Sequence, residues 1–485
     1  MSIDTSSPRP SRVGLKKPSA RISLPSLRLQ TSERKLLLIT MDLLLVSLAL
    51  VGSLLVGWEQ PITAPLLIAS FKWFLTLGVV WALVALFFDL YDLARSASTM
   101  TIVRSASLAA VVTALIYSLI PNLTPSLLAR SQVFVFAGLA WLGIVAWRVA
   151  YALFFVQPHF RQRALVIGAG WAGRTLAAAM QIAPHDANPY RGTGYELVGF
   201  IDDDPKLGGS LVAGIPVLGG AQSLVPLAQA LKINEVILAI THRHAIDQTL
   251  FDDLLRCQEL GIQLCTMADL YERLLNRVPV QHVGRDLSMA LPFGRSGYHR
   301  LFNVIKRLID LAAGLLGLAA LAAVALPAAV ANQLCCPGPL FYSQERVGRG
   351  GGVFRIFKFR TMIPNAEAQS GAVWAAHKDP RITPVGRFLR RTGVMRGEMS
   401  LIGPRPERPE FVQQLAATIP FYRARHAVRP GLTGWAQVQY HYGSSVDDAQ
   451  IKLEYDLYYV KYASFLLDLR IVLQTIPVML LFRGR

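Results

Sequence analysis

Residues 36–57 read LLLITMDLLLVSLALVGSLLVG, an apolar run whose only charged residue is Asp42. A helix of about 20 apolar residues can cross a membrane, so this stretch predicts a membrane span. Similar runs cover Trp73–Phe88, Ser105–Ala129 and Ser131–Val156. Together they predict a four-helix transmembrane bundle over residues 36–157. Asp42 lies near the basic end of its run and is expected to reach the membrane interface; the alternative is a buried functional carboxylate.

The basic residues orient this bundle. Residues 1–35 form a tail rich in Ser, Pro and basic residues, which we expect to be disordered, and they contain no signal-peptide pattern. This tail holds eight Lys/Arg, and Arg95 and Arg104 lie between the second and third runs, whereas the other loops hold only Lys72 and Arg130. Because basic segments stay in the cytosol, both ends of the bundle are predicted to face it.

The composition agrees with a membrane protein. Of 485 residues, 53% are hydrophobic and only 16% are charged, with a mean hydropathy of +0.38, which excludes an ordinary soluble enzyme. The net charge of +18 is compatible with nucleic acid, anionic lipid or anionic substrates. The apolar runs favour lipid and anionic substrates, and no nucleic-acid partner is predicted. The four cysteines lack metal-binding spacing and are expected to be reduced: Cys257, Cys265, Cys335 and Cys336.

Residues 162–290 change to an alternation of strands and helices. Short apolar strands are expected at Arg163–Gly168, Tyr195–Ile201, Ile233–Ile240 and Gly261–Met267, with helical segments between them. This order predicts a Rossmann-like module with a doubly wound parallel sheet. The first strand runs into a GxGxxG turn formed by Gly168, Gly170 and Gly173, and Asp202 ends the next strand. Such a turn suits a phosphate, so the module either binds a NAD-type dinucleotide or is structural or regulatory.

A third region spans residues 300–485. Leu311–Leu334 carries no charge, yet the segment from Glu345 to Arg429 holds 16 Lys/Arg against 6 Asp/Glu and is therefore expected to be cytosolic. Both flanks then lie on one side, so residues 306–334 are predicted to form a re-entrant membrane helix that breaks at Pro327. A full fifth span is the alternative. Ser464–Leu481 predicts an interfacial helix.

Arginines recur in this region among prolines and glycines. Phe357-Lys358-Phe359-Arg360-Thr361, Gly386-Arg387-Phe388-Leu389-Arg390-Arg391 and Gly403-Pro404-Arg405-Pro406 follow one another, and Arg429-Pro430-Gly431-Leu432-Thr433-Gly434-Trp435 comes later. Arginine binds phosphate through two parallel hydrogen bonds. These segments therefore predict a pocket at the membrane surface that holds a diphosphate and a lipid phosphate.

These motifs identify a resemblance. The runs Pro404–Phe411 (PRPERPEF) and Gly434–Val438 (GWAQV), with Tyr442–Ala449 (YGSSVDDA), resemble the large polyprenyl phosphate sugar-1-phosphate transferases of bacterial exopolysaccharide and O-antigen synthesis, along nearly the whole chain. The resemblance implies an α/β catalytic domain and a multi-pass protein of the bacterial inner membrane. It implies that a UDP-sugar donates sugar-1-phosphate to undecaprenyl phosphate with the help of Mg²⁺. These enzymes are often homodimers, a state that the sequence does not fix, nor does it name the sugar.

The resemblance also assigns site residues. Lys358, Arg360 and Arg405 match phosphate-binding positions, and Arg387 and Arg391 add to them. Lys306, Arg307 and Asp310 match the anchor of the re-entrant helix. For each arginine the alternative is a surface charge that faces anionic lipid.

The sequence departs from the family at the catalytic centre. The family's Asp-Glu dyad, in which the Asp attacks phosphorus and the Glu helps to bind the metal, lies in an Asp-Glu-Leu-Pro-Gln motif. Here Arg391-Thr392-Gly393 runs directly into Val394-Met395-Arg396, so the motif is absent, and Glu398 is expected to keep a supporting role. The gap is natural, engineered or a sequence error. A non-catalytic assembly subunit is thus an alternative function. A nucleotide-sugar dehydratase or epimerase is disfavoured because residues 174–290 contain no Tyr-x-x-x-Lys pair.

Overall fold

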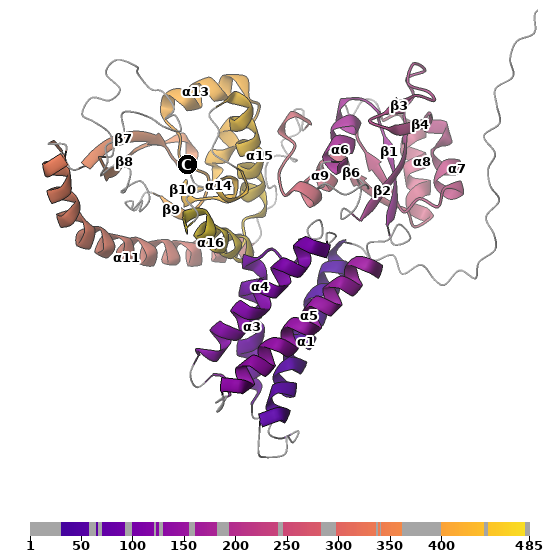
Figure 1. Ribbon diagram of the computed structural model, residues 1–485. Coiled ribbons are helices and arrows are strands. Elements are labelled where there is room, and N and C mark those ends of the chain that lie inside the picture. Colours follow the sequence, from indigo (N-terminus) through magenta and orange to yellow (C-terminus); the bar gives the residue numbers. More distant parts are fainter. Residues whose placement is uncertain are drawn as a thin grey trace, which may run out of the picture.

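The computed structural model describes residues 31–57, 65, 70–92, 99–120, 123–125, 130–154, 161–181, 194–240, 246–282, 297–335, 338–339, 341–360, 399–440 and 445–480. We refer to three parts: the helix bundle (residues 31–154), the sheet module (161–282) and the C-terminal domain (297–480). Figure 1 shows the sheet module and the C-terminal domain at one end of the helix bundle.

Four helices pack together in the bundle. They are α1 (Thr31–Gly57), α3 (Phe71–Phe87), α4 (Thr99–Ser118) and α5 (Arg130–Phe154). All four contribute side chains to one apolar core, while other leucines such as Leu48 and Leu55 stay exposed. Among the described residues, Glu33–Val56, Met100–Ser118 and Gln132–Phe154 are long and apolar enough to cross a membrane, and Phe71–Phe87 is a shorter apolar helix.

Two sequence predictions in the bundle are wrong. The third apolar run was expected to be helical through Ala129, but α4 ends at Ser118. Pro121 follows closely, and a proline disfavours helical backbone at the residue before it. Asp42 does not reach an interface: it is fully buried and pairs with Arg148 of α5, which is equally buried. A carboxylate in an apolar bundle is stabilised by such a partner.

The sheet module contains the predicted parallel α/β sheet. Its strand order is β3-β4-β2-β1-β5-β6, and only β3 runs antiparallel to its neighbour β4. The strands are β1 (Gln162–Ile167), β2 (Tyr195–Ile201), β3 (Leu211–Val212), β4 (Ile215–Gly219), β5 (Glu235–Leu238) and β6 (Gln263–Thr266). The β3–β4 hairpin was not predicted from the sequence.

Helices cover both faces of this sheet (Figure 1). One face packs against α6 (Trp171–Gln181) and α9 (Met267–Leu275). The other packs against α7 (Leu224–Ala230) and α8 (Gln248–Glu259). The buried valines, isoleucines and leucines of β1 point alternately into the two cores, which explains its continuous apolar sequence.

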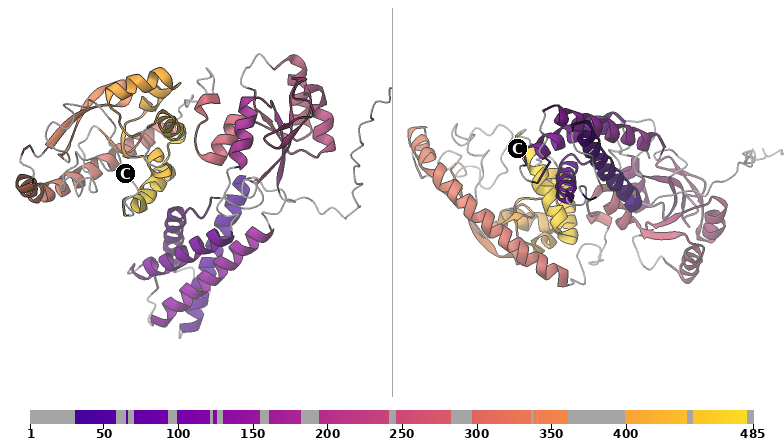
Figure 2. Two further views of the ribbon diagram at one scale, coloured as in Figure 1. Left: turned by 45° about the horizontal axis from the view of Figure 1, so that its top comes forward. Right: turned by 90° about the horizontal axis from the view of Figure 1, so that it is seen from below.

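The C-terminal domain begins with α11 (Gly297–Cys335), a helix of 39 residues. The sequence predicts a break at Pro327, but the helix continues through this residue. A proline removes one backbone hydrogen bond and can bend a helix without ending it. Figure 1 shows α11 curving at its C-terminal end, and Figure 2 shows it as a long rod along one edge of the domain.

The remaining elements of the domain form a compact group beside α11. A hairpin pairs β7 (Phe341–Val347) with β8 (Val353–Phe359), and β9 (Ser400–Ile402) pairs in parallel with β10 (Gly431–Thr433). The helices are α13 (Pro409–Thr418), the 3₁₀ helix η7 (Tyr422–Ala427), α14 (Trp435–Gln439), α15 (Val446–Tyr462) and α16 (Phe465–Leu480). The predicted interfacial helix corresponds to α16.

Candidate functional site

The loop after β9, residues 403–407, carries the PRP motif and lies against β10. Gly403 donates its N–H to the carbonyl of Thr433 at 2.9 Å. A side chain at Gly403 would collide with the backbone of Arg429, and one at Gly431 would collide with Gly403 itself. The two glycines therefore let the loop and β10 approach more closely than other residues allow.

Four successive carbonyl groups of this loop each accept a hydrogen bond from a different part of the domain. Their partners, in chain order, are the Gly431 N–H for Pro404 (2.8 Å), the Arg425 guanidinium for Arg405 (3.0 Å), the Arg346 guanidinium for Pro406 (3.2 Å) and the Val347 N–H for Glu407 (3.0 Å). We call this set the carbonyl clamp. It fixes the loop backbone from which the Arg405 side chain projects.

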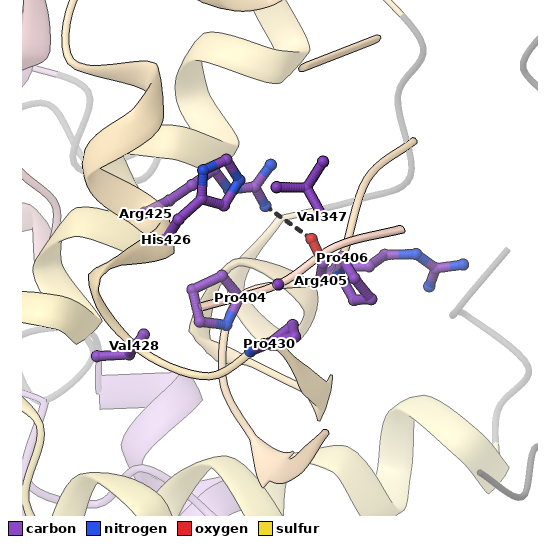
Figure 3. Close-up of a pocket in the computed structure, with 9 residues that line it drawn as sticks. Val347, Pro404, Arg405, Pro406, Arg425, His426, Val428 and Pro430 are labelled. Carbon is purple, nitrogen blue, oxygen red and sulfur yellow. Dashed lines mark hydrogen bonds between the residues drawn. The ribbon is translucent and has the colours of Figure 1, made fainter. Parts of the chain in front are cut away.

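The Arg405 side chain is exposed on this fixed loop. Figure 3 shows it pointing away from Arg425, which holds its carbonyl. A small pocket beside the loop is lined by Val347, Gly348, Pro404, Arg405, Pro406, Arg425, His426, Val428 and Pro430. An exposed guanidinium on a rigid backbone is chemically suited to a phosphate.

Arg425 is the buried centre of the clamp. Its guanidinium donates to Asp456 at 2.6 Å and to the hydroxyl of Tyr422 at 2.7 Å, and Arg425 and Asp456 are 6% and 1% exposed. Burial raises the pKa of Asp456 to about 6, and the neighbouring Arg425 opposes this rise. Burial lowers the pKa of His426 to about 4, so this ring is neutral at physiological pH.

Two of the predicted helix anchors attach α11 to the rest of the domain. Lys306 donates to Asp468 of α16 at 2.7 Å. Asp310 accepts hydrogen bonds from the Ser400 hydroxyl and from the Leu401 N–H, both at 2.9 Å. Within the described residues, Arg307 forms no ion pair. The N-terminal half of α11 is thus tied to α16 and to β9, which directly precedes the clamped loop.

The other predicted site residues are not brought to this loop by any described contact of their side chains. Arg360 is 6% exposed, and its guanidinium packs against Gly338. Lys358 pairs with Tyr342 in the hairpin, but its side chain lies outside the described part of the chain, as do Arg387, Arg391 and Glu398. Sequence reasoning missed Arg425 and Asp456, since nothing local distinguishes these residues from surface charges. Arg346 lies in the basic stretch that precedes Lys358, but its role in holding the loop was not predicted.

The described residues do not by themselves fit a Mg²⁺ site. Among them, no group of three or more His, Cys, Asp or Glu could hold a metal ion. The carboxylates of Asp310, Asp456 and Asp468 are bonded to the hydroxyl or cationic groups already named.

The glycine turn of the sheet module, formed by Gly168, Gly170 and Gly173, is hydrogen-bonded to Asp202. Gly168 has φ +100° and packs on the backbone of Ala239, where only glycine fits. Asp202 accepts the Ala169 N–H at 2.7 Å and the Asp204 N–H at 2.9 Å. Within the described turn, the Ala169 N–H is therefore already bonded to Asp202.

An apolar bundle joined to a domain with a clamped arginine loop defines the class as a membrane-associated α/β protein. The sequence matches the family described as bacterial sugar transferase over residues 301–482, and a CoA-binding domain family over residues 86–247. The chain belongs to the bacterial sugar transferase family.

Named relatives agree with this membership. The chain is 32% identical over 362 residues to a UDP-glucose:undecaprenyl-phosphate glucose-1-phosphate transferase of Escherichia coli (strain K12), covering 68% of this chain and 74% of the relative. It is 40% identical over 237 residues to a UDP-N-acetylgalactosamine-undecaprenyl-phosphate N-acetylgalactosaminephosphotransferase of Aeromonas hydrophila, covering 47% of this chain and 54% of that protein. The alignment thus spans about half the length of the Aeromonas relative.

Proposed function

We propose that this chain binds a UDP-sugar and undecaprenyl phosphate, the two substrates named for its relatives, at the clamped loop of the C-terminal domain. The observation that carries the proposal is the carbonyl clamp, in which the buried pair of Arg425 and Asp456 helps to fix the backbone that presents Arg405. A guanidinium carried on a fixed backbone binds phosphate with a smaller ordering cost than one on a mobile loop, which suits a diphosphate donor and a lipid phosphate acceptor.

The chain is proposed to sit in the bacterial inner membrane with four spans, and with α11 as a re-entrant helix that returns through the curve at its C-terminal end and not through a break at Pro327. The three long apolar helices support this arrangement, as does α3, which packs into the same core. The leucines of α11 support membrane contact, because Leu308, Leu315 and Leu316 are 61%, 70% and 73% exposed. Labelling of Cys335 and Cys336 from the cytosolic face of sealed vesicles tests the re-entry; labelling only from the opposite face would establish a fifth span.

Turnover is proposed to be absent or very low in this chain. In the family the Asp of the dyad forms a covalent bond to phosphorus, and a carboxylate at that position is missing here. The absent dyad also favours a second candidate function, that of a non-catalytic subunit in the assembly of a polysaccharide synthesis complex.

One experiment separates these functions. The full chain in nanodiscs is incubated with UDP-glucose, UDP-galactose or an N-acetylated UDP-sugar and undecaprenyl phosphate, and UMP release and donor binding are measured. A matched variant carries the whole missing family segment, which includes Asp-Glu-Leu-Pro-Gln, between Gly393 and Val394, and Arg405→Gln tests the loop in both backgrounds.

Donor binding without UMP release by the original chain, and UMP release by the insertion variant, are the expected results. Polyprenyl diphosphate sugar formed by the original chain would refute the proposed lack of turnover. Loss of both binding and turnover in both chains would refute the substrate assignment and leave the assembly function.

A further inference from the structure

Asp89 joins the helix bundle to the C-terminal domain. It lies just beyond Phe88, the residue that follows α3, in left-handed backbone with φ +52°, a conformation that costs energy for a residue other than glycine. One carboxylate oxygen of Asp89 accepts three hydrogen bonds from α16: two from Arg470, at 2.8 and 3.1 Å, and one from Gln474 at 2.7 Å. Asp89 and Arg470 are largely buried, with side chains 9% and 25% exposed.

The same turn is held from inside the bundle. The carbonyl of Leu90 accepts a hydrogen bond from Arg148 at 2.8 Å, and Arg148 in turn pairs with the buried Asp42 of α1. The position of Asp89 is therefore set by the packed helices and not by a loose surface loop.

Arg470 connects Asp89 to the centre of the C-terminal domain. Its guanidinium lies over the ring of Trp435, 5.1 Å from the ring centroid, a geometry typical of cation–π contacts. Trp435 is 1% exposed and stacks on Tyr458. Its indole N–H donates to the carbonyl of Asn276 in the sheet module at 2.9 Å. Arg470 and Trp435 together therefore contact both the helix bundle and the sheet module.

Trp435 is also close in sequence to the clamp. It begins α14, two residues after β10 ends at Thr433. Thr433 binds Gly403, and Gly431 of the same strand holds Pro404 of the clamped loop. A continuous set of short contacts thus links the end of α3 to the loop that presents Arg405. We call this set, which runs through Asp89, Arg470, Trp435 and β10, the relay.

We propose that Asp89, Arg470 and Trp435 are positioning residues that set the depth of the clamped loop relative to the membrane, and that they thereby govern binding of the lipid acceptor but not of the soluble donor. The phosphate of a membrane-bound lipid stays at a fixed depth, so the loop must be held at that depth. A nucleotide sugar arrives from solution and follows the loop wherever it lies. This inference rests on the proposed function.

The test compares Arg470→Gln with Arg355→Gln in the full chain in nanodiscs. Arg355 is a matched control because it pairs with Glu345 on the exposed hairpin, with side chains 69% and 54% exposed. Undecaprenyl phosphate binding is measured by native mass spectrometry and UDP-sugar binding by titration. Small misplacements of a binding group are costly, so Arg470→Gln is expected to weaken lipid binding roughly tenfold or more and to leave donor affinity unchanged. Arg355→Gln should change neither.

Equal loss of donor and lipid binding in Arg470→Gln, or no loss of either, would overturn the inference. Hydrogen exchange of the same variants judges the linkage independently of any substrate. Faster exchange that reaches residues 433–440 and 276–280 supports the relay, and faster exchange confined to α16 overturns it. If the unchanged chain binds neither substrate, the proposed function fails, and the exchange measurement still decides whether the relay exists.

Discussion

Replacement of Asp456 by Asn tests the carbonyl clamp directly. The substitution keeps the shape of the side chain but removes the charge opposite Arg425, whose side chain is only 7% exposed. A buried charge left without its partner costs about 3–5 kcal/mol. Arg425 retains the Tyr422 hydroxyl and the Arg405 carbonyl, so the lower half of this range is expected.

The magnitude can be converted into a melting temperature. For a unit of 150–250 residues, 1 kcal/mol shifts the Tm by about 2–4 °C, so Asp456→Asn should lower the Tm of the C-terminal domain by roughly 6–16 °C. The measurement is differential scanning fluorimetry of the full chain in nanodiscs. It is made at pH 8, because burial raises the pKa of Asp456 to about 6 and the native carboxylate is then ionised.

A double variant separates stability from loop geometry. Apolar replacement of a buried ion pair is often neutral or stabilising, so R425M/D456L should recover most of the lost Tm. The Arg405 carbonyl would still lack its donor, and UDP-sugar binding should remain weaker than in the unchanged chain. A fall in Tm of less than about 2 °C in Asp456→Asn would show that the pair is not the centre of the clamp.

Three further predictions concern other contacts. Burial lowers the pKa of His426 from 6.5 to about 4. The contribution of the neutral His426 ring to stability is therefore present above pH 6.5 and lost as the pH falls towards 4. His426→Asn should remove about 1–2 kcal/mol of this acid sensitivity, seen as a flatter Tm–pH profile. Gly173→Ala places a methyl group against a backbone carbonyl of the glycine turn and should destabilise the sheet module by about 1–3 kcal/mol in thermal melts followed by circular dichroism, whereas Gly170→Ala meets open space and should not. Lys461→Met leaves the buried Glu272 without its cation, which it contacts at 2.8 Å, and should speed hydrogen exchange at the contact between α9 and α15. The double variant E272Q/K461M also removes the unpaired charge and should exchange more slowly than Lys461→Met. Equal exchange in the two variants would contradict this reasoning.

Local patterns explain what the sequence could predict. Four apolar runs, the GxGxxG turn and the strand–helix alternation each report on a few neighbouring residues, and the bundle helices and the parallel sheet follow from them. The β3–β4 hairpin escaped prediction because β3 has only two residues, too short for a periodic signal. The continuity of α11 through Pro327 escaped because a proline bends or ends a helix depending on what surrounds it.

The pairing of distant charges could not be predicted. Asp42 and Arg148 lie 106 residues apart, and Asp89 and Arg470 lie 381 apart. Each looks like an interfacial or surface charge in its own segment, and only the packing of the helices brings the partners together. The candidate site has the same character: Arg405 stands in a recognisable motif, but the residues that hold its backbone come from β7, η7 and β10.

The described carboxylates of the C-terminal domain also bear on whether another acid can replace the missing dyad. Those that are buried or partly buried have structural partners: Asp310 holds the Ser400 hydroxyl, Asp456 holds Arg425, and Asp468 holds Lys306. The buried Glu454 pairs with Arg277 of the sheet module. A nucleophile must be free to attack phosphorus, so recruiting any of these would break a contact that holds α11, the carbonyl clamp or the sheet module. Glu345 is exposed, but it pairs with Arg355 on the hairpin. A single substitution that releases one of these acids from its partner should therefore not restore turnover. Reinsertion of the missing segment, by contrast, changes none of the residues that make these contacts.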